Sequence, residues 1–456
     1  MSQFCKTQLC ATVESSADQI TSSDATTDFL FSTFAVDGIE PTNRISKVTF
    51  GSLPDASTVP NGQVAYLDDA KVPVIASNGT WIGFDGRTVG AFVENQLWSW
   101  GSGLGGRLGD GAQTGRISAV REFCLATNWC QVTGGVFNTA AIKTSGELWL
   151  WGGNNCGLLG DGTTTATCSP VREFCSATDW CQVSGGCFHT VAVKTSGELW
   201  VWGGNACGVV GDGTLTSRCS PVREFCSATD WCQVSAGERH TAAVKISGQI
   251  WSWGSGNGGR LGDGTSTNRY IPVREFCSAA DWCQVSAGQC QSAAIKTSGE
   301  LWVWGGNNYA TLGDGTTTTR CSPVREFCSA TDWCQASANL NHTAAVKTSG
   351  EIWTWGRNTC GQSGNGNTTQ LCSPVREICS ATDWFQVTAG GFHTAAIKTS
   401  GQLWAWGGNV CGSLGDGTTL NRCSPVREFC SATDWCQVSG GSCHTAAIKS
   451  VTVVCR

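Results

Sequence analysis

The chain has 456 residues, of which 40% are hydrophobic and only 14% are charged, so its composition excludes an intrinsically disordered protein. No continuous apolar run is long enough to span a bilayer, and a formal net charge of −6 without a basic block excludes a protein that binds nucleic-acid backbones by charge alone. The 59 glycines, 28 cysteines and 22 tryptophans against a single methionine indicate a motif that is counted many times.

Residues 1–45 are polar and free of repeats, and we expect them to form an extended N-terminal arm. The opening MSQFCKTQLCATVESS lacks the basic and apolar segments of a secretory signal. A count of 28 cysteines is nevertheless unusual for a protein of a reducing compartment. A virion protein, made in the cytoplasm and released by lysis, would account for both observations, and so would a surface protein exported by another route.

Residues 46–88 are predicted to form a small β module. The segments GQVAYLDD and VPVIASNGTW are typical of the two strands of a hairpin, and Trp81 supplies an apolar anchor. The same residues resemble short modules near the start of phage tail-fibre and other virion proteins. This resemblance implies an attachment role, in which the N-terminal arm and the module dock on other virion proteins.

Residues 89–456 are built from a repeat of 51 residues. The motif Trp-x-Trp marks each copy, and it starts at Trp98, Trp149, Trp200, Trp251, Trp302, Trp353 and Trp404. Three tryptophans in each of the seven repeats, together with Trp81, account for all 22. A period of this length is typical of solenoids and propellers.

Each repeat contains four short strands and no helical period. In ELWVW, Trp200 and Trp202 share one face of the strand, and Leu199 and Val201 share the other, so we expect this strand to be buried on both sides. PVREF begins at a proline and is more polar, which suits an outer strand. WCQVSAG and HTAAVK contain small residues that suit the crowded centre of a ring.

Four short strands cannot bury two apolar faces alone, so the repeats must stack on one another. We predict an all-β fold, a seven-bladed β-propeller preceded by the arm and the small module. GAFVENQLWSW at the first Trp-x-Trp resembles AAIKTSGELWLW of the next repeat, and the last repeat ends in HTAAIKSVTVV. The same type of strand thus occurs at both ends of the array, so one blade is expected to combine both ends. An open solenoid, the alternative, would need polar capping repeats, and the sequence contains none.

The recurring string WGGN…GDGT…P…QVSAG…HTAAVK resembles the repeat of the regulator-of-chromosome-condensation family. The resemblance covers about residues 89–456 and implies a seven-bladed propeller, but it does not imply a particular function. Members of that family include a nucleotide exchange factor for a small GTPase and a secreted inhibitor of β-lactamases. The inserted catalytic hairpin of the exchange factor and a basic chromatin-binding tail have no counterpart in this sequence.

Cysteines recur in two sets of positions. The first cysteine pairs, spaced C-x5-C, are Cys124/Cys130, Cys175/Cys181, Cys226/Cys232, Cys277/Cys283, Cys328/Cys334 and Cys430/Cys436. The second cysteine pairs are Cys156/Cys168, Cys207/Cys219, Cys360/Cys372 and Cys411/Cys423. Each pair brackets a turn and its members are mostly gained and lost together, so we predict disulfides worth about 2–3 kcal/mol each. Zinc sites, a redox site and buried reduced cysteines are the alternatives.

Histidine and aspartate each occupy a fixed repeat position. All five histidines, His189, His240, His342, His393 and His444, share one position, which Asn138 and Gln291 fill in the other two repeats. Exchange with amides favours a hydrogen-bonding role over a metal or anion site. The aspartates of GDG favour a tight turn over calcium binding, which needs several oxygen ligands. We therefore expect no metal site and no cofactor.

The residues just before the histidine position differ most between repeats. The candidate binding loops there are represented by Phe137, Phe188, Arg239, Gln289, Asn341 and Phe392. Recognition usually resides in loops carried by a rigid scaffold. Sequence drift at unconstrained loop tips is the alternative.

These observations predict a virion structural protein, such as a tail-fibre, tail-associated or capsid-decorating protein. Its disulfide-stapled propeller would bind a host-surface receptor, a glycan or another virion protein, as a homo-oligomer within an assembly. We expect no nucleic-acid binding, no membrane insertion and no catalytic residues, because catalysis usually needs one asymmetric site. The alternative is a cellular or secreted interaction propeller, exchange-factor-like or inhibitor-like, with an extracellular location as the second possibility. A carbohydrate-active enzyme would need a pocket of convergent acidic and aromatic residues, which the sequence does not show.

Overall fold

The computed structural model describes residues 46–48, 64–67, 72–77, 80–83 and 91–454. The predicted arm at residues 1–45 lies outside the described residues. The chain divides into two compact units, and one of them contains Asn95–Lys449. The boundaries proposed at residues 45, 46, 88 and 89 stay predictions.

Four strands near the N-terminus form a small sheet of their own. They are β1 (Ser46–Val48), β2 (Val64–Leu67), β3 (Val72–Ser77) and β4 (Thr80–Gly83), in that order across the sheet. Strands β1 and β2 are parallel, and the other neighbours are antiparallel. The predicted hairpin is confirmed, because β2 pairs with β3 from Val64↔Ile75 to Leu67↔Val72.

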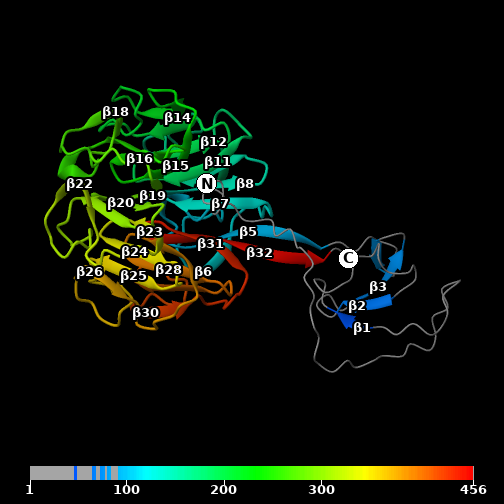
Figure 1. Cartoon of the computed structure of the whole chain (residues 1–456). Helices are drawn as coiled ribbons and strands as arrows, with labels where there is room; N and C mark the ends of the chain where they lie inside the picture. The colour runs from blue at the N-terminus through cyan, green and yellow to red at the C-terminus, as the bar shows by residue number, and fades with distance from the viewer. Residues whose placement is uncertain (1–45, 49–63, 68–71, 78–79, 84–90, 455–456) are drawn as a thin grey trace, which may run out of the picture. The chain divides into compact units, whose positions relative to one another are not determined.

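Seven four-stranded sheets follow one another in chain order as the blades of a propeller (Figure 1), which confirms the predicted fold. Six blades consist of consecutive strands. The seventh combines β31 and β32 from the C-terminal end of the array with β5 and β6 from the N-terminal end. The predicted closure of the ring by both ends of the repeat array is therefore also confirmed.

Four strands make up each blade, from an innermost strand at the axis to an outermost one. The blades are β7 (Trp129–Gly134), β8 (Asn138–Lys143), β9 (Leu148–Gly152) and β10 (Thr167–Arg172); β11 (Trp180–Gly185), β12 (His189–Lys194), β13 (Leu199–Gly203) and β14 (Arg218–Arg223); β15 (Trp231–Ala236), β16 (His240–Lys245), β17 (Ile250–Gly254) and β18 (Arg269–Arg274); β19 (Trp282–Ala287), β20 (Gln291–Lys296), β21 (Leu301–Gly305) and β22 (Arg320–Arg325); β23 (Trp333–Ala338), β24 (His342–Lys347), β25 (Ile352–Gly356) and β26 (Leu371–Arg376); β27 (Trp384–Ala389), β28 (His393–Lys398), β29 (Leu403–Gly407) and β30 (Arg422–Arg427); and β31 (Trp435–Gly440), β32 (His444–Val454), β5 (Ala91–Gly101) and β6 (Arg116–Arg121). Two short 3-10 helices, η3 (Leu104–Gly106) and η4 (Asn257–Gly259), lie in the loops that follow β5 and β17.

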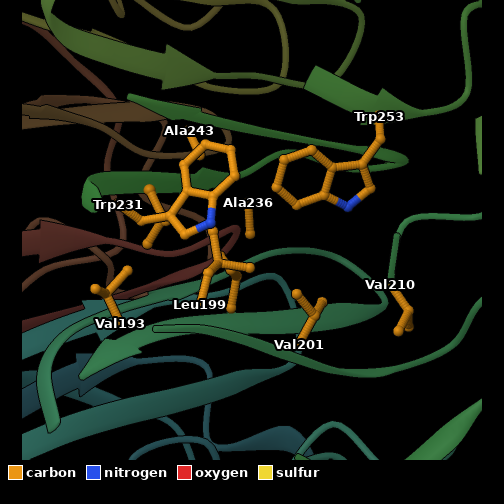
Figure 2. Close-up of a cluster of buried hydrophobic side chains, with 10 residues drawn as sticks. Val193, Leu199, Val201, Val210, Trp231, Ala236, Ala243 and Trp253 are labelled. Atoms are coloured by element: carbon orange, nitrogen blue, oxygen red, sulfur yellow. The ribbon is translucent and has the colours of Figure 1, made fainter. Parts of the chain in front are cut away.

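Tryptophans join each blade to the one before it. In the cluster of Figure 2, Trp231 and Trp253 pack against Val193, Leu199 and Val201 of the preceding blade. Trp253, Leu199 and Val201 are each 0% exposed. The prediction that this third strand is buried on both faces is thus confirmed, because one blade supplies the indoles and its neighbour supplies the apolar face.

The outermost strand begins earlier than the sequence indicated. Strand β14 covers Arg218–Arg223, so Pro221 lies inside the strand rather than at its start, and Phe225 lies beyond its end. Proline lacks an N–H group, and an outermost strand has one edge that needs no donor. This edge therefore tolerates Pro221 in mid-strand.

Two rings of polar side chains close the propeller around its axis. Each glutamine of the innermost strands accepts a hydrogen bond from a backbone N–H of the next blade, as Gln182 does from Val234 at 2.9 Å. The ring continues across the seam, where Gln437 accepts from Val132 N at 2.8 Å. A second ring uses serine and threonine hydroxyls, for example Ser439, which accepts from Gly134 N at 3.0 Å.

Replacing the wedge tryptophan should cost far more stability than replacing an exposed aromatic residue. We expect Trp253→Ala to destabilise the propeller by about 3–5 kcal/mol, because it leaves a cavity between two blades and removes a buried hydrogen bond. Phe225→Ala, at a position 61% exposed, should change stability by less than about 1 kcal/mol. Urea unfolding followed by circular dichroism measures both. Equal losses for the two variants would contradict the proposed role of the wedge.

Candidate functional site

The predicted binding residues all lie in the turns between the innermost and second strands, which we call the inner turns. Phe137 follows β7, Phe188 follows β11 and Arg239 follows β15. Gln289 follows β19, and the remaining two, Asn341 and Phe392, occupy the same turn after β23 and β27. Because strands within a blade are antiparallel, these turns lie at one end of the ring, where the long loops between the third and outermost strands also begin and end. We call this end the inner-turn face.

The inner turns surround a polar cavity on the propeller axis. Its volume is about 130 Å³, and Val136, Cys187, Glu238, Gln289 and Leu340 contribute to its lining. A second cavity of about 160 Å³ continues along the axis between the glutamine and the serine or threonine rings. Glycine, alanine and serine supply most of the remaining walls, so the axis is narrow and polar.

Three of the six predicted binding residues are brought together. The rings of Phe137 and Phe188 lie 6.3 Å apart, and the Arg239 guanidinium lies 6.0 Å from the Phe188 ring centre. Gln289, Asn341 and Phe392 are half-buried further round the ring. Sequence reasoning missed a fourth participant, Arg107, whose guanidinium lies 5.8 Å from the Phe137 ring centre. Arg107 comes from the long loop of the preceding blade. The next repeat has Leu158 at the same position, and this exchange of a charged for an apolar residue was the sign in the sequence that could have identified Arg107.

The histidines form hydrogen bonds between blades. His189 Nε2 lies 2.9 Å from the hydroxyl of Thr241 in the next blade, and that hydroxyl donates to Val209 O at 2.9 Å. A hydroxyl has one hydrogen, so the imidazole must donate through Nε2–H and carries no proton on Nδ1. The predicted hydrogen-bonding role is consistent with this geometry, although the partner is a side chain of the next blade and not local backbone.

Burial keeps these imidazoles neutral. Complete burial lowers the pKa of His189 and of His342 to about 3 and the pKa of His393 to about 4. Burial also lowers the pKa of His240 and His444, and the nearby guanidiniums of Arg260 and Arg107 lower them further. With no exposed surface and one nitrogen already engaged, the histidines serve the architecture of the ring.

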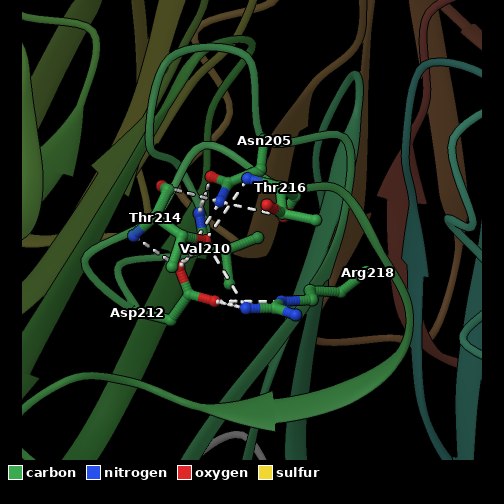
Figure 3. Close-up of polar contacts among 6 residues, drawn as sticks. All are labelled: Asn205, Val210, Asp212, Thr214, Thr216 and Arg218. Atoms are coloured by element: carbon green, nitrogen blue, oxygen red, sulfur yellow. Dashed lines mark hydrogen bonds and ion pairs between the residues drawn. The ribbon is translucent and has the colours of Figure 1, made fainter.

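A polar network centred on an asparagine holds five of the seven long loops in shape, as Figure 3 shows for one copy. Asn205 Nδ2 donates to Thr214 O at 3.0 Å and to Thr216 O at 3.2 Å, while its side-chain oxygen accepts from Val210 N. Asp212 accepts from Thr214 N at 2.9 Å and pairs with the Arg218 guanidinium. Burial opposes ionisation of Asp212, but hydrogen bonds from Thr214 and Arg218 outweigh it and lower its pKa.

Glycine makes this loop possible beside the wedge. Gly211 has a φ of +73°, and a Cβ atom there would lie 2.5 Å from Trp253 Nε1. These contacts give the GDG segment a structural role, as the sequence indicated. Among the described residues, no group of three or more histidine, cysteine or carboxylate side chains is placed to hold a metal ion.

The described cysteines form no disulfides, so the predicted stapling of the ring finds no support in the structure. This correction applies to both sets of positions. It covers the first cysteine pairs, Cys124/Cys130, Cys175/Cys181, Cys226/Cys232, Cys277/Cys283, Cys328/Cys334 and Cys430/Cys436, and the second cysteine pairs, Cys156/Cys168, Cys207/Cys219, Cys360/Cys372 and Cys411/Cys423.

In the first cysteine pairs, the two members lie in different surroundings. The first member is exposed in a turn, as Cys175 is, whereas the second begins the innermost strand, and Cys181 packs against an interblade cluster. In five blades the thiol of this second member donates to a carbonyl oxygen of the adjacent strand at 3.3–3.4 Å, and these contacts are Cys181 to Val193, Cys232 to Val244, Cys283 to Ile295, Cys334 to Val346 and Cys436 to Ile448. The two cysteines of a pair are close along the chain, but this spacing does not determine the directions in which their side chains point.

Members of the second cysteine pairs contact different neighbouring blades. A Cβ atom on Gly204 of the following blade would lie 3.2 Å from Cys156 Cβ. The second members instead meet the preceding blade, where the last glycine of the GDG or GNG turn donates from its N–H group at 2.8–2.9 Å to the carbonyl oxygens of Cys168, Cys219, Cys372 and Cys423. The two members of a pair therefore adjoin opposite sides of their blade, which explains why their shared gain and loss did not indicate a bond.

The end of the ring opposite the inner-turn face carries exposed aromatic residues. The turn that leads from each outermost strand to the next blade exposes Phe123, Phe174, Phe225, Phe276, Phe327 or Phe429, at 61–66% of their surface. A Cβ atom on Gly213 would lie 3.2 Å from the Phe225 ring, so this ring packs over the glycine of the adjacent GDG turn. Their sameness in six repeats gives this end no unique location for a partner. No helix in the described part of the chain is long and apolar enough to cross a membrane.

Comparison with known proteins gives one consistent family. Residues 223–455 match the RCC1-like domain, and residues 145–193 and 196–244 match the regulator of chromosome condensation (RCC1) repeat. The ultraviolet-B receptor UVR8 of Arabidopsis thaliana is 32% identical over 334 residues, which are 72% of this chain and 76% of that protein. The mitochondrial RCC1 domain-containing protein RUG3 of the same plant is 27% identical over 78% of this chain and 89% of its own length.

Other relatives share only the propeller. The human E3 ubiquitin-protein ligase HERC2 is 27% identical over 80% of this chain, but the chain spans only 8% of HERC2. Yeast RCC1 (Prp20), solved bound to Kap60, superposes with a TM-score of 0.71 at 17% identity, over 79% of this chain and 90% of that one. Human WBSCR16 superposes with a TM-score of 0.69 at 20% identity, over 78% of this chain and 98% of that one. These two structures support the fold alone.

The comparisons correct the predicted function. The relatives are cellular proteins, among them a light receptor, a ubiquitin ligase and a mitochondrial protein, so the prediction of a virion structural protein with virion partners is wrong. The predicted virion location is wrong for the same reason, and the extracellular alternative is not supported. The resemblance of residues 46–88 to phage virion modules finds no support in these comparisons either. The cysteine count, interpreted as a sign of an oxidising environment, led to this error.

The buried histidines should make the propeller sensitive to acid. Because the pKa of His393 is about 4 in the folded chain and 6.5 when unperturbed, only the unfolded state takes up this proton between those values. Stability therefore falls as pH decreases from about 6.5 to about 4, by up to about 1.4 kcal/mol per pH unit for each histidine. His393→Asn, which copies Asn138 of another repeat, should reduce this slope. Urea unfolding at several pH values measures it, and parallel pH profiles for variant and parent would contradict the assignment.

The Asp212–Arg218 pair should contribute little, and its contribution should depend on salt. Asp212→Asn keeps an acceptor for Thr214 N but removes the ion pair with Arg218, so we expect a loss of at most about 1 kcal/mol that shrinks at high salt. Asp161→Asn is the matched control, because Thr167 stands there in place of the arginine. Urea midpoints at low and high salt give both values. A salt-dependent loss at Asp161 as large as that at Asp212 would contradict the assignment.

Proposed function

The chain belongs to the RCC1-like family, and from this premise we propose that it is a cellular regulator that binds a partner protein through the inner-turn face of its propeller. The fold is shared by relatives of different activity, so the function must reside in features that this chain places on the scaffold. One observation carries the proposal. The buried layers repeat from blade to blade, whereas the inner turns differ and gather Phe137, Phe188 and Arg239 at one location.

The chemistry of this location suits a protein partner. Aromatic and arginine side chains are the residues that most often dominate the binding energy of protein interfaces. Yeast RCC1 is solved bound to the protein Kap60, and a second yeast structure concerns its binding to Gsp1p and histones. A partner could dock on a ring of seven identical blades in seven equivalent orientations. Because the inner turns differ from one another, they favour one of these orientations.

Binding explains the described residues better than catalysis does. The five histidines are fully buried, so none reaches a substrate as an acid or a base. The axial cavity of about 130 Å³ is much smaller than the roughly 300–1,000 Å³ of typical small-molecule sites. We therefore infer that the chain acts by positioning another protein.

Removing the two phenylalanines should abolish partner binding without unfolding the ring. Crosslinking in cells, followed by mass spectrometry, identifies the bound protein, and biolayer interferometry with the purified pair measures the affinity. We expect the double variant Phe137→Ala/Phe188→Ala to weaken binding at least about tenfold, in keeping with two central aromatic contacts. Phe225→Ala, on the opposite end of the ring, should bind as the parent does. If Phe225→Ala loses binding while the double variant binds fully, the interface lies at the end of the ring opposite the inner-turn face, and the proposal is refuted.

A further inference from the structure

Four side chains form a continuous row on the inner-turn face. We call Arg107, Phe137, Phe188 and Arg239 the Arg–Phe row. Arg107 Cζ lies 5.8 Å from the Phe137 ring centre, the two phenylalanine rings are 6.3 Å apart at an angle of 45°, and Arg239 Cζ lies 6.0 Å from the Phe188 ring centre. The row thus presents two apolar rings with a guanidinium at each end.

Phe137, Phe188 and Arg239 of the row are accessible, and the middle of the row is apolar. Phe137 is 41% exposed and the Arg239 side chain is 54% exposed, while Phe188 is half-buried between them. Exposed phenylalanine rings gain free energy when a partner covers them. The guanidinium groups over the two phenylalanine rings also restrict the motion of these rings. The phenylalanine side chains therefore lose little conformational entropy when a partner binds.

Arg107 is the stronger sign of an anionic ligand. It is only 6% exposed, and it donates to two carbonyl oxygens, Leu104 O at 2.8 Å and Val136 O at 3.0 Å. No ion pair joins it to a carboxylate of the described residues. A largely buried guanidinium with spare donors pays a desolvation penalty that an incoming carboxylate offsets. Arg239 differs, because Glu238 lies 3.4 Å away and is itself mostly buried.

We propose that the Arg–Phe row binds a protein segment in which an apolar side chain stands between acidic residues. This inference rests on the proposed function and names the chemistry of the partner. The apolar side chain covers Phe137 and Phe188, and carboxylates on either side of it reach Arg107 and Arg239. Arginine forms paired hydrogen bonds with a carboxylate, so the two ends of the row also fix the position of the segment.

No other three successive repeats combine two arginines and two phenylalanines at these positions. The position of Arg107 holds Leu158, Val209, Arg260, Thr311, Gln362 or Ser413 in the other repeats. The position of Phe137 and Phe188 holds Arg239, Cys290, Asn341, Phe392 or Cys443. A single row gives one such binding location on the ring.

Nucleic acid is the competing ligand, because arginine and aromatic residues also bind phosphates and bases. The formal charge of −6 and the Glu238 carboxylate beside Arg239 repel a strand of many phosphates more than a protein segment with two carboxylates, which needs only local contacts with two guanidiniums. A strand of many phosphates would meet a net repulsion at longer range. The experiment below includes both ligands.

Fluorescence anisotropy with three labelled probes tests the proposal on the full chain. The first is a short peptide with leucine between aspartates, the second replaces each aspartate by asparagine, and the third is an oligothymidylate. We expect the acidic peptide to bind at least about tenfold more tightly than its amide counterpart, and salt to weaken it. Equal binding of both peptides, no detectable binding of the acidic peptide, or tighter binding of the oligothymidylate would overturn the proposal.

Three variants connect the binding to the row. Arg239→Gln and Phe188→Ala should each weaken the acidic peptide at least about fivefold, and so should Arg107→Leu, which copies Leu158 of the next repeat. Phe225→Ala is the matched control and should leave the affinity unchanged. Full binding by Arg239→Gln and Phe188→Ala would overturn the proposal even if Arg107→Leu fails to fold.

The outcomes also separate this inference from the proposed function. A cellular partner that requires Phe137 and Phe188 but is not displaced by the acidic peptide would refute the ligand chemistry and leave the inner-turn face as the interface. A partner that binds without these phenylalanines would refute the proposed function itself.

Discussion

Each blade depends on the blade before it, because its buried indoles rest on an apolar face that the neighbour supplies. Trp253 packs on Leu199 and Val201 of the preceding blade, and its Nε1 donates to Val209 O at 2.8 Å in the long loop of that blade. The neighbour therefore provides both the dry surface and the acceptor that a buried indole needs. A blade alone would leave both unsatisfied, so the array is stable only when its last blade returns to its first. The same bond joins Trp151 Nε1 to Arg107 O at 3.0 Å across that seam.

Periodicity is the reason that the sequence predicted so much of this fold. Alternation in ELWVW assigned opposite faces to Trp202 and Val201, and the occurrence of the same type of strand at both ends of the array predicted the mixed blade. The glutamine and serine rings escaped prediction, because Gln182 in an alternating strand looks like a solvent-facing residue. Its half-buried position and its bond to Val234 N arise only when seven innermost strands converge on one axis. The start of the outermost strand was also missed. A proline is tolerated within an edge strand, so its position does not mark where such a strand begins.

The candidate site shows what repeats can and cannot reveal about function. Variation among repeats pointed to Phe137, Phe188 and Arg239 in the inner turns, but it could not show which of the six positions meet. Arg107 joins them from the long loop of another blade, a contact that no local pattern records. Cysteine spacing misled for a related reason. A pair such as Cys175 and Cys181 is close along the chain, yet the direction of each side chain is set by burial against a neighbouring blade.

The backbone explains why the inner turns are free to differ. At this face the blades are joined by main-chain hydrogen bonds, for example from Val136 N to Gly186 O at 3.1 Å and from Cys187 N to Gly237 O at 3.3 Å. Such bonds require a backbone N–H group and do not depend on the side chain of the donor residue. Tryptophan wedges, histidines and glutamines contribute to closure through their side chains, so a change there that loses the side-chain contact weakens the ring. Closure thus uses main-chain atoms of the inner turns whose side chains remain free to vary, and a ring built from near-identical blades can acquire one distinctive surface without losing its stability.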